Sequence, residues 1–88
     1  MTPVITSVEA KPDHKLRVTF RKYGPKLFDV RPYLTKGVFE ELRDERYFRK
    51  VRIIHGGIEW PHEQDLSAET LFYRSLPVKQ SFKRTRKV

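Results

Sequence analysis

The sequence predicts a small α+β domain, in which an antiparallel sheet of about five short strands, arranged as two hairpin units, packs with two or three short helices. Three observations predict it. Apolar and polar residues alternate in several short segments, as they do along half-buried strands. Pairs that contain Gly or Pro separate those segments. The middle of the chain instead spaces its apolar residues as a short helix does. Because the chain has 88 residues, we expect one domain at 1–76 and a basic, flexible tail at 77–88.

Three strands are expected in the first hairpin unit. Residues 4–10 alternate and give the first strand, and residues 27–30 give a short third one. The second strand, at 16–21, is the clearest, because its two faces differ in polarity. One face carries Leu16, Val18 and Phe20, and the other carries Arg17, Thr19 and Arg21. Turns are expected at Pro12-Asp13 and Gly24-Pro25.

A short helix is expected at 37–43, followed by a second helical turn near 44–48. Its buried face would carry Val38, Phe39 and Leu42. The β-branched segment 50–54 then predicts another strand. Gly56-Gly57 supplies the positive φ values of a tight hairpin, and the returning strand, 58–60, ends at Pro61.

A closing helix is expected after this second hairpin. Asp65 or Ser67 can cap it by accepting a hydrogen bond from an otherwise unpaired backbone N–H. Glu69 in its first turn suits the positive end of the helix dipole. The contacts that we expect to be buried are Leu66, Leu71 and Phe72.

The composition excludes several classes of protein. The chain has no cysteine, so it can form neither disulfides nor thiolate zinc sites. No apolar run is long enough to cross a bilayer, and the N-terminal segment lacks the pattern of a secretory signal. These features predict a cytoplasmic protein. The net charge of +8 is uneven, because residues 11–26 hold six basic side chains against one acidic, and residues 77–88 hold five basic ones and no acid. Such clusters favour polyanions as partners.

Three segments of the chain resemble a known family. They read LRVTFRKYGPKLFDVRPYL, GVFEELRDERYFRKVRI and GGIEWPHEQDLSAETLF, and together they are similar to the bacterial family called domain of unknown function 2442. The residues that carry the pattern are expected to be structural: Phe20, Gly24, Asp29, Phe39, Leu42, Phe48, Ile58, Trp60, Pro61, Asp65 and Leu66.

This resemblance implies a small α+β fold with an antiparallel sheet, and no established catalytic activity. Some members carry an added helix-turn-helix domain, and others are short single-domain products encoded beside small partner genes, as in toxin–antitoxin pairs. The present chain departs from the pattern in two respects. It has no room for a helix-turn-helix domain, and it carries the basic segment 77–88.

The polar residues after the second hairpin contain the side-chain types of a catalytic or metal site. Ser67, His62 and Asp65 could form a hydrolytic triad, but no Gly-rich loop offers an oxyanion hole, and residues so close in sequence seldom reach the required geometry. A metal site would use His55 and His62, with Glu63, Asp65 or His14, and their spacing matches no structural zinc site. We therefore expect capping and turn roles, no enzyme activity, no metal and no cofactor.

Two further residues have alternative roles. Trp60 could be an exposed stacking platform, but it shares a strand face with Ile58 and is expected in the core against Phe20, Phe39 or Phe48. Asp29 could point outward from its strand or cap the following turn, and we expect the cap.

The basic residues give the strongest functional indication. Arg17 and Arg21, with Lys15, lie on the outward face of one strand, and Tyr23, Tyr73 and Phe82 place aromatic rings among the charges, as in single-strand binders. The candidate polyanion-binding residues are Lys15, Arg17, Arg21, Lys22, Lys26, Lys79, Lys83, Arg84, Arg86 and Lys87. Solvation of a strand face and protection of a sheet edge explain the same residues without any ligand.

Two hypotheses follow. The first is a non-catalytic interaction domain that binds a partner protein, in the manner of an antitoxin, through an exposed sheet edge or the basic strand face. The second is a small RNA- or DNA-binding protein that uses the basic strand face and tail. A homodimer formed by strand pairing is open under either hypothesis, and a membrane partner is not expected.

Overall fold

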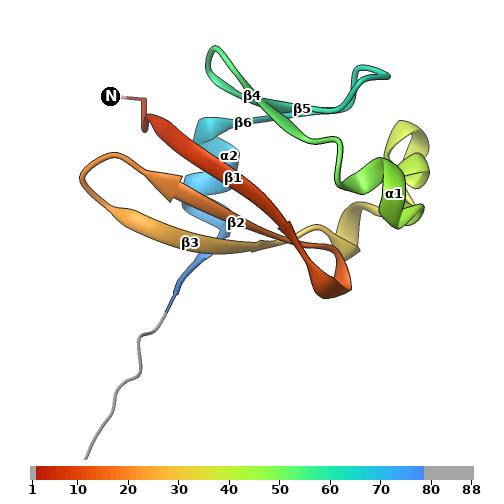
Figure 1. Ribbon diagram of the computed structural model, residues 1–88, viewed down its shortest axis with the longest axis horizontal. Coiled ribbons are helices and arrows are strands. Elements are labelled where there is room, and N and C mark those ends of the chain that lie inside the picture. Colours follow the sequence, from red (N-terminus) through yellow and green to blue (C-terminus); the bar gives the residue numbers. More distant parts are fainter. Residues whose placement is uncertain (1, 79–88) are drawn as a thin grey trace, which may run out of the picture.

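The computed structural model describes residues 2–78 and confirms the α+β class (Figure 1). Seven strands and two α-helices alternate with three 3₁₀ helices, labelled η, over these residues. Their order is β1 (Ile5–Lys11), η1 (Pro12–His14), β2 (Lys15–Phe20), β3 (Gly24–Asp29), η2 (Arg31–Tyr33), η3 (Gly37–Arg43), α1 (Glu45–Phe48), β4 (Arg52–Ile54), β5 (Gly57–Glu59), β6 (Asp65–Ser67), α2 (Ala68–Arg74) and β7 (Leu76–Pro77).

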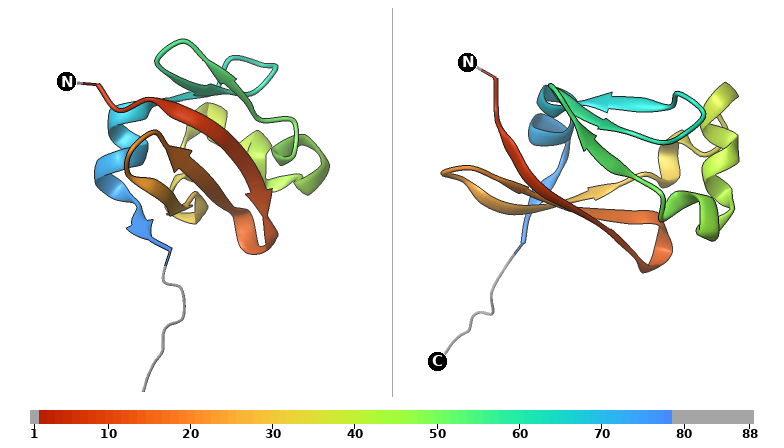
Figure 2. Two further views of the ribbon diagram at one scale, coloured as in Figure 1. Left: turned by 60° about the vertical axis from the view of Figure 1, so that its left-hand side comes forward. Right: turned by 45° about the horizontal axis from the view of Figure 1, so that its top comes forward.

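The strands form two antiparallel sheets. One has the order β1-β2-β3-β7 and the other has the order β4-β5-β6. The sheets lie on opposite sides of the core, with α2 at one end and η3 and α1 at the other (Figure 2). All five predicted strands are present as β1 to β5, and the short strands β6 and β7 extend the two sheets. None of the helices in the described part of the chain is long and apolar enough to cross a membrane.

The first sheet confirms the predicted faces of β2. Leu16, Val18 and Phe20 are buried, while Arg17 and Thr19 are half-buried on the other face. The expected turn at Gly24-Pro25 is wrong, because β3 begins at Gly24, which pairs with Phe20. The connection consists instead of 21–23, and Lys22 adopts the positive φ of 75° that sequence patterns assign to glycine.

The predicted helix at 37–43 is a 3₁₀ helix, and this changes its buried face. A 3₁₀ helix has three residues per turn, so residues three apart share a side. Leu42 is accordingly buried and Phe39 packs against the core, whereas Val38 is 67% exposed. The prediction that Val38 faces the core is therefore wrong.

The two glycines of the second hairpin have different roles. Gly56 has a φ of 84°, as the turn requires, but Gly57 lies in β5 with no positive φ. A Cβ on Gly57 would lie 2.2 Å from the carbonyl oxygen of Leu66 in the neighbouring strand. The expectation that both glycines supply positive φ is wrong, and Gly57 instead allows β5 and β6 to approach closely.

The closing helix is capped by Ser67, whose hydroxyl accepts a hydrogen bond from the backbone N–H of Thr70 at 3.1 Å. Asp65 belongs to β6 and lies opposite Glu59. Leu66 and Leu71 are buried as expected, while Phe72 is half-buried. The two alternatives for the cap are thus resolved in favour of Ser67.

Trp60 lies in the core, which confirms the structural interpretation of this residue. Its ring is fully buried and stacks on Phe48 at a centroid distance of 6.0 Å. The indole N–H donates a hydrogen bond to the backbone carbonyl of Phe48 at 2.8 Å, so its polar atom is satisfied. The remaining large buried side chains include Phe20, Phe28, Leu16, Leu42, Ile58 and Leu71.

The chain leaves the domain along the first sheet. In β7, Leu76 pairs with Leu27 and Pro77 pairs with Lys26. Pro77, the first residue of the predicted tail, therefore belongs to a strand. The rest of that tail, from residue 79, lies outside the described residues, together with the candidate residues Lys79, Lys83, Arg84, Arg86 and Lys87.

Candidate interaction site

The three residues of the hydrolytic alternative make separate contacts. The Nδ1 atom of His62 lies 2.5 Å from the Oε2 atom of Glu41, on η3. The hydroxyl of Ser67 is engaged by the backbone N–H and hydroxyl of Thr70. Asp65 is exposed on β6. These side chains do not form a catalytic relay in the structure.

A buried hydrogen-bond network explains the polar residues after Trp60. Gln64 is only 2% exposed, and its amide nitrogen donates to the carbonyl of Val38 and to the carboxylate of Glu41. Its side-chain oxygen accepts from the hydroxyl of Tyr47 at 2.6 Å. The same hydroxyl accepts from the backbone N–H of His62 at 2.8 Å. This network fixes η3 and α1 to the turn between β5 and β6, which is a structural role.

The network also changes the ionisation of Glu41. The hydrogen bond from the Gln64 amide, assisted by His62, holds the pKa of the Glu41 carboxyl below its ordinary value, against a smaller opposing effect of burial. The ring of His62 stacks on that of Tyr47 at 5.1 Å. His62 is thus engaged by protein groups on two sides.

The histidines are not arranged as a metal site. The Nε2 atom of His14 lies 3.2 Å from the carbonyl oxygen of Arg43, and its ring packs against Phe48. Within residues 2–78, no three side chains of His, Cys, Asp or Glu come together as a group that could hold a metal ion.

Acidic residues of the neighbouring strands lie opposite the basic residues of β2. Arg17 lies opposite Glu9 of β1, and Lys15 lies opposite Asp29 of β3. Glu9 also forms a salt bridge of 3.8 Å with Lys11. The predicted basic strand face is therefore partly neutralised by carboxylates within the same sheet.

Asp29 caps the turn after β3, as expected. Its Oδ1 atom accepts a hydrogen bond from the backbone N–H of Arg31 at 3.0 Å. The guanidinium of Arg31 binds both carboxylate oxygens, and this hydrogen bonding holds the pKa of Asp29 below its ordinary value.

Lys26 lies on the opposite face of the sheet from Arg17. It pairs with the buried residue Val18, and its Nζ atom donates to the carbonyl oxygen of Phe72 at 2.7 Å. The same ammonium lies 4.0 Å from the centre of the Phe72 ring. Lys26 thus stabilises the C-terminal turn of α2, and the structure does not bring it together with Lys15 and Arg17.

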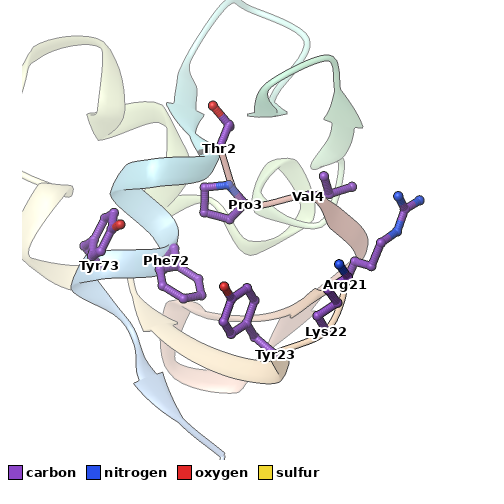
Figure 3. A pocket seen from close by; sticks show the side chains of 8 residues that line it. All are labelled: Thr2, Pro3, Val4, Arg21, Lys22, Tyr23, Phe72 and Tyr73. Atoms are coloured by element: carbon purple, nitrogen blue, oxygen red, sulfur yellow. The ribbon is translucent and has the colours of Figure 1, made fainter.

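Arg21 and Lys22 are placed elsewhere, at the mouth of a cleft of about 460 Å³. The N-terminal segment, the β2–β3 turn and the end of α2 form its walls (Figure 3). Its lining residues are Thr2, Pro3, Val4, Arg21, Lys22, Tyr23, Phe72 and Tyr73. None of the eight is acidic.

Aromatic rings form one side of this cleft. Tyr23 packs edge-on against Phe72 at 4.9 Å, and Phe72 packs edge-on against Tyr73 at 5.1 Å. Tyr23 is nevertheless 59% exposed and Tyr73 is 73% exposed. Within the described residues, neither Arg21 nor Lys22 takes part in a salt bridge.

Sequence reasoning identified Arg21, Lys22, Tyr23 and Tyr73, but it missed the other wall. Thr2, Pro3 and Val4 precede β1 and carry no recognisable motif. Their position follows from the folded structure, in which the backbone N–H of Arg21 donates to the carbonyl of Val4 at 2.8 Å. This bond holds the N-terminal segment beside the β2–β3 turn.

The comparisons with known proteins identify a family without assigning a function. No curated protein and no solved structure matches the chain. The family model described as Protein of unknown function (DUF2442) matches residues 5–77, which comprise nearly the whole of the described chain. The chain therefore belongs to the DUF2442 family of proteins of unknown function.

Proposed function

We propose that this protein is a non-catalytic interaction domain that binds a partner protein through the cleft between the N-terminal segment, the β2–β3 turn and α2. One observation carries the proposal. Six large apolar side chains are exposed in the described part of the chain, and three of them, Val4, Tyr23 and Tyr73, line this cleft. Exposed tyrosines in a concave site are typical anchors of protein interfaces.

The family resemblance supports an antitoxin-like version of this proposal, in which the partner is the product of a neighbouring gene. The proposal includes a cytoplasmic location, which the absence of cysteine favours. It leaves open whether the domain acts as a monomer or a homodimer.

The test uses the full chain as an affinity bait in lysate of its native cells. A protein that is retained is then purified, and its binding is measured by calorimetry with the wild type and with Tyr73→Ser. We expect affinity to fall at least about tenfold, because the exposed ring is the anchor. Val38→Ser is the matched control, since Val38 is exposed to a similar extent, 67% against 73%, but lies on η3. Equal affinity of Tyr73→Ser and Val38→Ser would overturn the cleft as the binding site.

Binding to RNA or DNA is the second candidate function. It is favoured by Lys11, Lys15 and Arg17 on one sheet face and by the five basic residues in 77–88. Fluorescence anisotropy with single- and double-stranded oligonucleotides, at low and moderate salt, tests it. Affinity that falls steeply with salt and is lost when the chain ends at residue 76 would support this candidate. If the protein shows no affinity for oligonucleotides at moderate salt, this candidate fails and the partner-protein proposal stands.

A further inference from the structure

We propose that the cleft recognises an acidic segment of the partner that inserts one large apolar or aromatic side chain. This inference rests on the proposed function and specifies the chemistry of the partner. It is argued from the charge at the mouth of the cleft, from the rings that line it, and from its size.

The charge at the mouth is positive and has no internal counterpart in the described part of the chain. Arg21 and Lys22 are both exposed and lack a salt bridge there, whereas Arg31 and Arg52 on the same domain are paired with Asp29 and Glu59. A ligand carboxylate would meet two cations and no acid among the lining residues. Complementary charge of this kind selects acidic partners and excludes basic ones.

The interior of the cleft is suited to an apolar group. Phe72 is already surrounded, since Phe20 packs edge-on against it at 5.1 Å and Lys26 lies over its ring. Tyr23 and Tyr73 retain exposed rings beside it, and Pro3 lies across the cleft from Tyr23 and Phe72 (Figure 3). A side chain inserted here would contact apolar surface on both walls.

The size of the cleft favours one anchor rather than a long track. A volume of about 460 Å³ is near the lower part of the range for small-ligand sites, which is about 300–1,000 Å³. It can therefore hold one large side chain and its neighbouring backbone. Edge-on contacts are a favoured geometry for aromatic pairs, so an aromatic anchor can pack against the exposed rings of Tyr23 and Tyr73.

The same surface is less suited to a nucleic-acid strand. A strand carries a phosphate at every nucleotide, and affinity grows with the number of phosphates that are neutralised. Beyond Arg21 and Lys22, the neighbouring basic positions on β2 lie opposite acids, Arg17 opposite Glu9 and Lys15 opposite Asp29. As far as residues 2–78 show, the cleft offers a single pair of cations, which fits a short acidic segment better than a continuous phosphate backbone.

The experiment selects binders from a displayed library of short random peptides, with the full chain as bait. The double variant Arg21→Gln/Lys22→Gln and the variant Tyr73→Ser serve as counter-selections. We expect enriched peptides to combine acidic residues with one large apolar or aromatic residue. The affinity of the best peptide should fall about tenfold in the double variant, and should fall with salt.

Lys50→Gln is the control for charge, because it removes a positive charge from an exposed position after α1, away from the cleft. Circular dichroism of each variant establishes that it is folded. Enrichment of basic or uncharged peptides, equal loss of affinity in Lys50→Gln, or displacement of the peptide by an oligouridine at stoichiometric concentration would overturn the inference.

The outcomes separate this inference from the proposed function. If a native partner binds in a Tyr73-dependent manner but no acidic peptide is enriched, the partner-protein proposal stands and the acidic-anchor inference fails. If neither a partner nor a peptide depends on Tyr73, both fail.

Discussion

The hydroxyl of Tyr47 and the side-chain oxygen of Gln64 are joined by a buried hydrogen bond of 2.6 Å between α1 and the turn that follows Trp60. The two residues are 17 positions apart, and their contact ties together parts of the chain that no strand pairing connects. Because the same hydroxyl accepts from the backbone of His62, a single oxygen atom satisfies two polar groups. Removing it takes this partner from the buried Gln64 oxygen and from the part-buried N–H of His62.

Tyr47→Phe tests this relationship. We expect the variant to lose about 1–3 kcal/mol of unfolding free energy, because Gln64 and the His62 N–H lose a partner while the ring is kept. Urea unfolding followed by tryptophan fluorescence measures the loss. Tyr33→Phe is the matched control, since its ring stacks on Phe28 and its hydroxyl has no hydrogen-bond partner among residues 2–78. Equal stability of the two variants would show that the network contributes nothing.

The ionised carboxylate of Glu41 contributes to the stability of the domain, and we expect this contribution to be lost in acid. Its pKa in the folded protein is lowered, first by the hydrogen bond from Gln64 and then by His62. A lowered carboxyl pKa contributes stability that is present above the ordinary value near 4.5 and is lost as the pH falls through the folded value. We therefore expect Glu41→Gln to be less stable than the wild type at about pH 6 and to approach it at about pH 3.

Thermal unfolding at these two pH values measures the effect. Glu40→Gln is the control, because it removes the same charge from η3 without contacting Gln64 or His62. A stability difference between Glu41→Gln and wild type that stays constant from about pH 6 to about pH 3 would contradict the assignment.

Gly57 should tolerate no side chain. In Gly57→Ala, the new Cβ would lie 2.2 Å from the Leu66 carbonyl, so β5 and β6 must separate. We expect a loss of about 2–4 kcal/mol, comparable with severe overpacking of a core. Gly56→Ala is the informative control, because its Cβ meets nothing and only its φ of 84° is unfavourable, at a cost of about 1–2 kcal/mol. The two variants are compared by urea unfolding. A larger loss in Gly56→Ala would contradict the close-approach role of Gly57.

The residues whose roles were predictable from the sequence are those governed by a local period or a local cap. The alternation in β2 identifies Leu16, Val18 and Phe20 as core, and Asp29 is identified as a turn cap by its own neighbours. The division of strands into two sheets was not predictable, because the alternation within a strand does not show which strands pair. Strand β7 was missed because it depends on a pairing between Leu27 and a residue far along the chain.

The exposure of Val38 and the N-terminal wall of the cleft also depend on structure that the local sequence does not show. Nothing in the local sequence distinguishes a 3₁₀ helix from an α-helix at 37–43, so the exposure of Val38 was not foreseen. Only part of the candidate cleft was predictable from the sequence. Tyr23 and Tyr73 are aromatic residues among basic ones, whereas Pro3 and Val4 are held at the cleft by the backbone hydrogen bond between Val4 and Arg21.

Lys26 is one of the predicted polyanion-binding residues, and a substitution can test whether its role is structural instead. Its ammonium caps the carbonyl of Phe72 at the end of α2 and lies over the Phe72 ring, so Lys26→Met should cost about 1–2 kcal/mol of unfolding free energy. Lys50→Met, at an exposed position after α1, should leave stability within about 0.5 kcal/mol of wild type. Urea unfolding and oligonucleotide anisotropy are measured on both variants. If Lys26→Met instead keeps full stability and weakens oligonucleotide binding more than Lys50→Met does, Lys26 acts on a ligand and its contact with α2 is incidental.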